Sequence, residues 1–167
     1  MITDAYSHKI VGWALDTTLQ TKGSLAALQM AIKSLPKGKE RLIHHSDRGI
    51  QYCSKEYIQL LQAKDIRISR TSQGDPGENA LAERINRTIK EEFNCPAFLS
   101  FDLAKAAITQ AILSYNQLRP HASCDYLTPA QAHLREGLLN KRWRKYKRKN
   151  PVNQEWLIEK LNRIFTV

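Results

Sequence analysis

Short apolar runs alternate with amphipathic segments along this chain, and that alternation constrains its fold more than any other feature. The run 10–15 is rich in β-branched and aromatic residues, which predicts a strand. It is apolar on both faces, as in a strand covered by helices on either side. Strand, helix, strand, helix, strand in this order indicates an α/β fold in three layers. We predict strands over 10–15, 41–45 and 66–69, and helices over 24–35, 54–63, 79–93 and 102–118.

Serine residues mark where two of these helices should begin. Ser24 and Ser54 each precede an amphipathic stretch, and serine is a favoured N-cap because its hydroxyl accepts a hydrogen bond from the first turn. The first of these helices should end at Pro36-Lys37-Gly38. The residues 73–77, Gln-Gly-Asp-Pro-Gly, predict a loop before the helix that begins near residue 79.

The charge of the chain indicates a polyanionic partner. It has 167 residues, with 26 Lys and Arg against 16 Asp and Glu, for a net charge of +10. Nucleic acid is the commonest polyanion for such a protein, although an ordinary basic surface has the same composition. The length fits one domain over 1–140 and a basic tail over 141–167. Within that tail we predict DNA contacts from Lys141, Arg142, Arg144 and Lys145.

Cysteine usage and hydropathy indicate the cytoplasm. Cys53, Cys95 and Cys124 are odd in number and far apart, which is typical of reduced thiols and excludes a paired zinc-ligand spacing. We expect Cys53 to be a buried small apolar side chain. No stretch is long enough to span a membrane, and the first residues lack the pattern of a secretory signal.

Two carboxylates, Asp47 and Glu83, are the strongest candidates for chemistry. Asp47 follows a predicted strand and Glu83 lies in a predicted helix, with thirty-five residues (48–82) between them. Such a pair suits Mg²⁺, which binds one or two carboxylate oxygens and keeps several waters. Arg87 and Lys90 share a helix face with Glu83. Taken alone, Asp47 would be a turn residue, and Glu83 with Arg87 an ordinary stabilising pair.

Five ordered sequence blocks change that interpretation. They are Ser-His-Lys-Ile-Val-Gly-Trp (7–13), His-Ser-Asp-Arg-Gly-Ile-Gln-Tyr (45–52), Gly-Asp-Pro-Gly-Glu-Asn-Ala-Leu-Ala-Glu (74–83), Tyr-Asn-Gln-Leu-Arg-Pro-His (115–121) and Tyr-Leu-Thr-Pro-Ala (126–130). Together they resemble the integrase-like region of transposases of the insertion sequence three family, over about residues 2–133. A motif match is a hypothesis, but five blocks in one order are highly specific.

This resemblance implies an RNase H-like fold, a mixed sheet flanked by helices, as in retroviral integrases. It also implies an enzyme that cuts transposon ends and joins them to target DNA with Mg²⁺ or Mn²⁺. The second and third members of its Asp-Asp-Glu triad fall on Asp47 and Glu83. Arg87 and Lys90 fall where the family places cations toward DNA. Self-association is a further expectation. Glu78, where many relatives have Asp, is the alternative third ligand.

The first carboxylate of the triad is the open question. Asp4 is the only acid before the strand at Ile10, but the family places its first Asp on an earlier strand, which would precede Met1. We therefore predict that Asp4 is a turn residue whose side chain bonds its own backbone. On this alignment the chain lacks its first strand, and a sheet edge would be exposed for self-association.

Two alternatives to an active transposase remain. One is an inactive fragment that binds nucleic acid or associates with itself. The other is an RNase H-like nuclease of cellular repair, which would also need a complete acidic triad. His44 and His45 are adjacent on one predicted strand and so point to opposite faces, which excludes a shared metal. We expect His121 to be a structural hydrogen-bonding residue.

Overall fold

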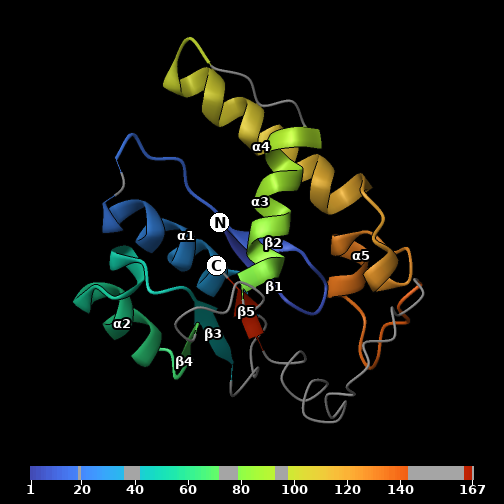
Figure 1. Ribbon diagram of the computed structural model, residues 1–167, viewed down its shortest axis with the longest axis horizontal. Coiled ribbons are helices and arrows are strands. Elements are labelled where there is room, and N and C mark those ends of the chain that lie inside the picture. Colours follow the sequence, from blue (N-terminus) through green and yellow to red (C-terminus); the bar gives the residue numbers. More distant parts are fainter. Residues whose placement is uncertain (19, 36–41, 72–78, 93–97, 143–163, 167) are drawn as a thin grey trace, which may run out of the picture.

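A mixed five-stranded sheet with helices on both faces forms the centre of the protein (Figure 1). The computed structural model describes residues 1–18, 20–35, 42–71, 79–92, 98–142 and 164–166. The strands are β1 (Ile2–Asp4), β2 (Ile10–Gly12), β3 (Ile43–Ser46), β4 (Arg67–Arg70) and β5 (Ile164–Thr166). The helices are α1 (Thr21–Lys33), α2 (Lys55–Gln62), α3 (Ala80–Glu92), α4 (Phe101–Leu118) and α5 (Pro129–His133).

The last strand of the chain lies in the middle of the sheet. The strand order is β2-β1-β5-β3-β4. β5 runs antiparallel to β1 and parallel to β3, while β1 pairs antiparallel with β2 and β3 pairs parallel with β4. The sequence predicted an exposed edge at this position, covered by self-association. In this structure the chain's own residues 164–166 occupy it.

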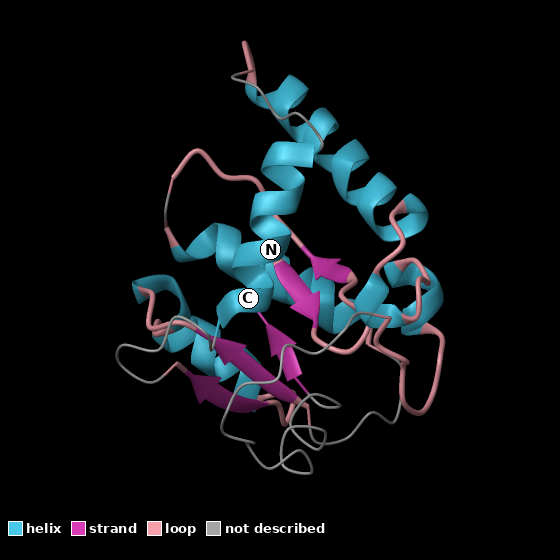
Figure 2. Ribbon diagram, turned by 45° about the vertical axis from the view of Figure 1, so that its right-hand side comes forward, coloured by secondary structure: helices cyan, strands magenta, loops and turns pink. Residues whose placement is uncertain are grey.

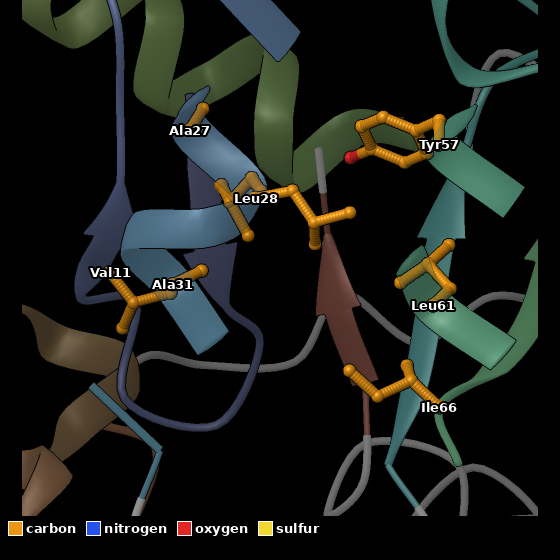
Figure 3. Close-up of a cluster of buried hydrophobic side chains, with 8 residues drawn as sticks. Val11, Ala27, Leu28, Ala31, Tyr57, Leu61 and Ile66 are labelled. Carbon is orange, nitrogen blue, oxygen red and sulfur yellow. The ribbon is translucent and has the colours of Figure 1, made fainter. Parts of the chain in front are cut away.

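Each face of the sheet has its own apolar core. On one face, β1 and β2 pack with α1, α2 and the residue before β4 (Figure 3). The buried residues of this first core are Ile2, Val11, Ala27, Leu28, Ala31, Tyr57, Leu61 and Ile66. A second core joins β2 to α3 and α4 through Ile10, Ile85, Ile89, Ala111, Ile112 and Tyr115. Burying such side chains is the main stabilising contribution to a layered fold of this kind.

Close approach of α1 to the sheet depends on Gly12. A Cβ atom at this position would lie 2.1 Å from the Ala27 carbonyl oxygen and 3.0 Å from Ala31. Because both contacts are with the helix itself, only glycine allows this helix–strand distance. The Val-Gly-Trp block is therefore a packing requirement of the fold.

Asn116 supplies hydrogen bonds to the edge strand β2. Its Oδ1 accepts from the Ile10 N–H at 3.0 Å, and its Nδ2 donates to the Ile10 carbonyl at 3.0 Å. Edge strands leave one row of backbone groups without a strand partner. The Tyr-Asn-Gln-Leu-Arg-Pro-His block thus fastens α4 to the sheet edge, which its sequence alone did not reveal.

Most predicted elements are present, with shifted ends. Ser54 caps α2 as predicted, accepting from Tyr57 N at 3.3 Å, and α3 and α4 begin and end within one residue of prediction. The Ser24 cap is wrong, because α1 begins three residues earlier after Gln20, which makes no side-chain capping bond. The strand predicted over 10–15 ends at Gly12, and β3 extends to Ser46. No helix in the described ranges is long and apolar enough to cross a bilayer.

Candidate metal and DNA site

Asp47 lies directly after β3, in a loop held by its own hydrogen bonds. Its Oδ1 accepts from the Gly49 N–H at 2.8 Å, and its side chain is exposed. Arg48 Nε donates to the Thr71 carbonyl at 3.1 Å, which fastens the loop to the end of β4. The next turn is a short 3-10 helix, Ile50–Tyr52. The Gly49 N–H thus orients the Asp47 carboxylate, which remains exposed to solvent.

Gly49 lies close to this carboxylate and to the Gln51 side chain. A Cβ atom built there would lie 2.9 Å from Asp47 Oδ1 and 2.7 Å from Gln51 Nε2. Any other residue would press on the Asp47 carboxylate or displace Gln51. The His-Ser-Asp-Arg-Gly-Ile-Gln-Tyr block therefore forms a hydrogen-bonded turn that presents the Asp47 carboxylate.

Glu83 lies in the first turn of α3 and is exposed. The opposite side of the helix is buried in the second core through Ile85 and Ile89, so Glu83 is directed away from that core. In Figures 1 and 2, α3 begins near the C-terminal label, by the end of the sheet at which the parallel strands β3 and β5 finish. A carboxylate in a first helical turn is also stabilised by the helix dipole.

The basic residues predicted to contact DNA differ in their ion-pair partners, and two of them lie outside the described residues. Arg87 Nε lies 3.2 Å from Glu91 Oε1, so its ion pair is with Glu91, and its side chain is 67% exposed. Lys90 is exposed on the same helix. Arg142 forms an ion pair with Asp125, and its N–H donates to the Ala122 carbonyl at 2.7 Å. Lys141 is exposed, whereas Arg144 and Lys145 lie outside the described residues, as does Glu78.

Asp4 lies at the end of β1 where the turn begins, and its side chain bonds the backbone of that turn, as the sequence predicted. The Asp4 carboxylate accepts from Ser7 Oγ at 2.5 Å and from the N–H groups of Tyr6 and Ser7 at 3.4 and 3.3 Å. His133 Nδ1 from α5 lies 2.9 Å from the same carboxylate. Burial raises the pKa of Asp4, but hydrogen bonds from His133 and Ser7 and the charge of His133 outweigh it, so the pKa lies below its usual value.

The sheet register separates Asp4 from Asp47. Asp4 pairs with Phe165, which pairs with His44, so Asp4 is level with His44 and two strands away. Asp47 is three residues further along the direction of β3, roughly 10 Å at the usual strand rise. β1 and β3 also run in opposite directions. Asp4 and Asp47 therefore lie toward opposite ends of the sheet.

The two adjacent histidines do point to opposite faces. His44 Nε2 lies 3.2 Å from the Tyr57 hydroxyl of α2, while His45 Nδ1 lies 2.9 Å from Ser69 Oγ of β4. Burial, and to a lesser degree His45, lower the pKa of His44 to about 4, so it is neutral at pH 7. Both have structural partners in the sheet and its helices.

Sequence reasoning missed a cluster of aromatic and imidazole rings under the 115–121 block. The His121 ring lies edge-on to Tyr115 and His8, with centroids 5.1 and 5.5 Å apart. Burial lowers the pKa of both His8 and His121 to about 4. This supports the structural role expected for His121. The prediction for Cys53 is wrong, because it lies exposed at the end of the Ile50–Tyr52 turn.

Comparison with known proteins gives a consistent family. Two family profiles, both described as Integrase core domain, match residues 1–76 and 64–129. Transposase InsF for insertion sequence IS3A of Escherichia coli (strain K12) is 31% identical over 133 residues, covering 78% of this chain and 46% of that protein. The putative transposase for insertion sequence element IS986/IS6110 of Mycobacterium tuberculosis (strain CDC 1551 / Oshkosh) is 31% identical over 136 residues, covering 78% and 49%. The chain thus spans about half the length of the curated relatives it matches.

Solved structures share the fold. The catalytic core domain of HTLV-2 integrase, in complex with magnesium, superposes in its trimeric form with a TM-score of 0.60 at 24% identity, covering 79% of this chain and 82% of that chain. Its dimeric form gives a TM-score of 0.58 at 25% identity, covering 79% and 81%. These likenesses confirm the predicted RNase H-like α/β fold. With the profile matches and the transposase relatives, they show that this chain belongs to the integrase core family, among the transposases of the insertion sequence three family.

Proposed function

We propose that this chain forms the core of a DNA transposase in which Asp47 and Glu83 hold a divalent metal, Mg²⁺ or Mn²⁺. The observation that carries the proposal is the Asp47 carboxylate, which follows a buried strand, is oriented by the Gly49 N–H at 2.8 Å and faces solvent. The matched curated relatives are transposases, and a solved protein of the same fold contains magnesium.

The chemistry of the donors fits such a metal. Mg²⁺ and Mn²⁺ prefer carboxylate oxygens, and Mg²⁺ commonly takes only one or two of them from the protein. Asp47 and Glu83 are both exposed, so both carboxylates are hydrated and accessible to a cation from solvent. A divalent metal held there would neutralise charge on the phosphodiester and activate the attacking oxygen. The protein's own part is to orient the Asp47 carboxylate through Gly49 and to present Glu83 from α3.

Exposed cations on α3 support DNA as the substrate. Arg87 and Lys90 lie four and seven residues after Glu83, so they share its side of the helix. They would bind phosphates beside the metal-binding carboxylates and position the strand. Phosphate contacts of this kind set register on the duplex and carry no sequence information.

Binding without chemistry is a second candidate function. The Asp4 carboxylate contacts Ser7 and His133. It lies toward the end of the sheet opposite to Asp47. Within the described ranges, no three His, Cys, Asp or Glu side chains lie close enough together to hold a metal. A chain with two of three carboxylates would bind nucleic acid and associate with itself, but would not transfer strands.

Metal titration tests the proposed site directly. Isothermal titration with Mn²⁺ should show saturable binding that weakens about tenfold or more in Asp47→Asn and in Glu83→Gln, the scale expected even for removing a group that only orients a ligand. Asp102→Asn and Glu56→Gln are matched controls, because both remove a carboxylate from a first helical turn. Equal affinity in all four variants would contradict the proposal.

A joining assay separates the two candidate functions. We expect this chain to join no end-sequence DNA in Mg²⁺ or Mn²⁺, because the Asp4 carboxylate is engaged by Ser7 and His133 away from Asp47. Its DNA binding should persist in Glu83→Gln. Joining by this chain that is abolished in Asp4→Asn would restore Asp4 as a ligand and overturn the assignment.

A further inference from the structure

The Arg48 side chain takes the place of a backbone hydrogen bond at the end of the sheet. In the parallel pair β3–β4, the Arg67 N–H donates to the Leu42 carbonyl at 2.8 Å. Four residues later, the Thr71 N–H donates to the Ser46 carbonyl at 3.0 Å. Because a parallel ladder is evenly spaced, the Thr71 carbonyl would next accept from the backbone N–H of residue 48. In this protein it accepts from Arg48 Nε, at 3.1 Å.

This hydrogen bond holds a guanidinium group beside the Asp47 carboxylate. Asp47 precedes Arg48 in the chain, and its own carboxylate is held by the Gly49 N–H at 2.8 Å. Nε supplies one of the five N–H donors of an arginine, so the four N–H groups of the two terminal amino groups remain for a ligand. The Arg48 side chain is exposed. A planar donor group that is fixed at Nε is therefore accessible from solvent next to the proposed metal ligand.

Arg48 differs from the arginines that this protein uses in ion pairs. Three such pairs occur in the described ranges: Arg87–Glu91, Arg119–Glu92 and Arg142–Asp125. Within those ranges Arg48 has no carboxylate at ion-pair distance, Asp47 included. Its hydrogen-bond partner is a neutral carbonyl, which orients the side chain without cancelling its charge.

We propose that Arg48 binds a backbone phosphate of the DNA strand held at Asp47, and so positions that strand for the reaction. A guanidinium group can bind phosphate through two parallel N–H···O bonds, which set orientation as well as affinity. The proposal rests on the proposed function, because a metal at Asp47 would hold the reacting phosphate next to this arginine. It adds a DNA contact from the sheet to those proposed for Arg87 and Lys90 on α3.

Two substitutions separate the structural hydrogen bond from the phosphate contact. Glutamine has its Nε2 at the same number of bonds from Cα as arginine Nε, so Arg48→Gln can keep the bond to Thr71 while it removes the charge. Arg48→Lys does the reverse, because lysine keeps a charge but has no donor at that position. Arg67→Gln is the matched control, since Arg67 is exposed on the same pair of strands but at the start of β4.

DNA binding is measured with the full chain and a fluorescent duplex in EDTA, so that no metal contributes. We expect Arg48→Gln to weaken binding about tenfold or more at low salt, the scale of a hydrogen bond to a charged group. It should also flatten the slope of log K against log salt by about 0.9. Arg48→Lys should keep the slope, because an ammonium group binds phosphate as a point charge. Arg67→Gln should bind DNA like the wild type.

Urea unfolding of the same variants identifies a purely structural role. Arg48→Lys loses the bond to Thr71, so its urea midpoint should lie below that of Arg48→Gln, although it binds DNA more tightly. If Arg48 only fastened the turn, the variant with the lower midpoint would also bind DNA more weakly. That order would overturn the phosphate contact, and so would a loss of affinity in Arg48→Gln no larger than in Arg67→Gln.

Chemical modification tests the same contact without a substitution. Phenylglyoxal reacts with accessible guanidinium groups, and mass spectrometry of proteolytic fragments gives the rate at each arginine. Saturating duplex DNA in EDTA should suppress modification of Arg48 and leave the rate at Arg67 unchanged. Equal protection of the two, or no protection of Arg48, would overturn the proposal. Because no metal is present, failure of the proposed metal site would appear in the Mn²⁺ titrations of Asp47→Asn and Glu83→Gln and not in these measurements.

Discussion

Single residues decide whether Asp4 belongs to the fold or to the chemistry. Its carboxylate joins β1 to the following turn through Ser7 and to α5 through His133. Asp4→Asn should lower the free energy of unfolding at pH 7 by about 1–3 kcal/mol, the cost of leaving buried partners without an acceptor. Urea denaturation measures this, with the exposed Asp102→Asn as the control.

The same carboxylate gives a pH signature. Because the pKa of Asp4 lies below its usual value of 3.8 in the folded protein, its contribution is present above pH 3.8 and disappears as the pH falls through the lower folded value. The stability difference between the wild type and Asp4→Asn should therefore shrink below about pH 4. A difference that grows on acidification would contradict this assignment.

His8 provides a second test, at higher pH. Burial holds its folded pKa at about 4, below 6.5, so the unfolded chain binds more protons between these values. Stability should therefore fall as the pH drops from 6.5 to 4, and His8→Asn should make that fall shallower. Asparagine suits the site because His8 has a φ of 62°, which asparagine tolerates. A thermal unfolding series from pH 7 to 4 checks the slope.

At the scale of residues, features set by neighbours in the sequence were predictable, and contacts between residues far apart in the sequence were not. The turn at Asp4 and the opposite orientations of His44 and His45 follow from neighbouring residues, so they were predictable. The contacts of Asp4 with His133 and of Asn116 with Ile10 join residues more than one hundred positions apart. No local pattern specifies such partners. The mutual placement of Asp47 and Glu83 is a prediction of the same long-range kind.

At the scale of elements, one face of α3 packs in the second core through Ile85 and Ile89, and the exposed face carries Glu83. Ile85→Ala on the buried face should lower the free energy of unfolding by about 2–5 kcal/mol, because it removes apolar packing and leaves a cavity. It should also weaken Mn²⁺ binding, since the helix that carries Glu83 would be less firmly placed.

Arg87→Ala on the exposed face of α3 is the comparison. Its effect on stability should stay within about 0.5 kcal/mol, as for most surface substitutions. Chemical denaturation of both variants distinguishes the faces. Similar destabilisation in the two would mean that α3 does not pack on the second core as described.

Helices with strong amphipathic periodicity and the short apolar strands β2, β3 and β4 were predictable from sequence, whereas α5 and β5 were not. α2, α3 and α4 have buried faces at helical spacing, and the Ser54 and Ser100 side chains cap the first and last of them. α1 begins without a side-chain cap, so its start carries no signal. β5 is three residues long, and it pairs with β1 and β3. Propensity alone cannot specify such a strand.

For the molecule as a whole, the charge of +10 should make DNA binding depend on salt. Removing one cation that binds a phosphate should flatten the slope of log K against log salt by about 0.9 for duplex DNA. Arg87→Gln and Lys90→Gln should each do so, whereas Lys33→Gln, at the end of α1 on the other face, should not. Fluorescence anisotropy between low and moderate salt measures the slopes. Identical slopes for all three variants would show that α3 does not contact DNA.

The proposed activity of the molecule depends above all on one divalent ion bound between Asp47 and Glu83. The most direct measurement is anomalous diffraction from crystals of this chain grown with Mn²⁺. We predict an anomalous peak within roughly 2.2 Å of a carboxylate oxygen from each of these two residues, the usual range for hard cations and oxygen ligands. A peak at Asp4, or carboxylates of Asp47 and Glu83 too far apart to share an ion, would contradict the proposed site.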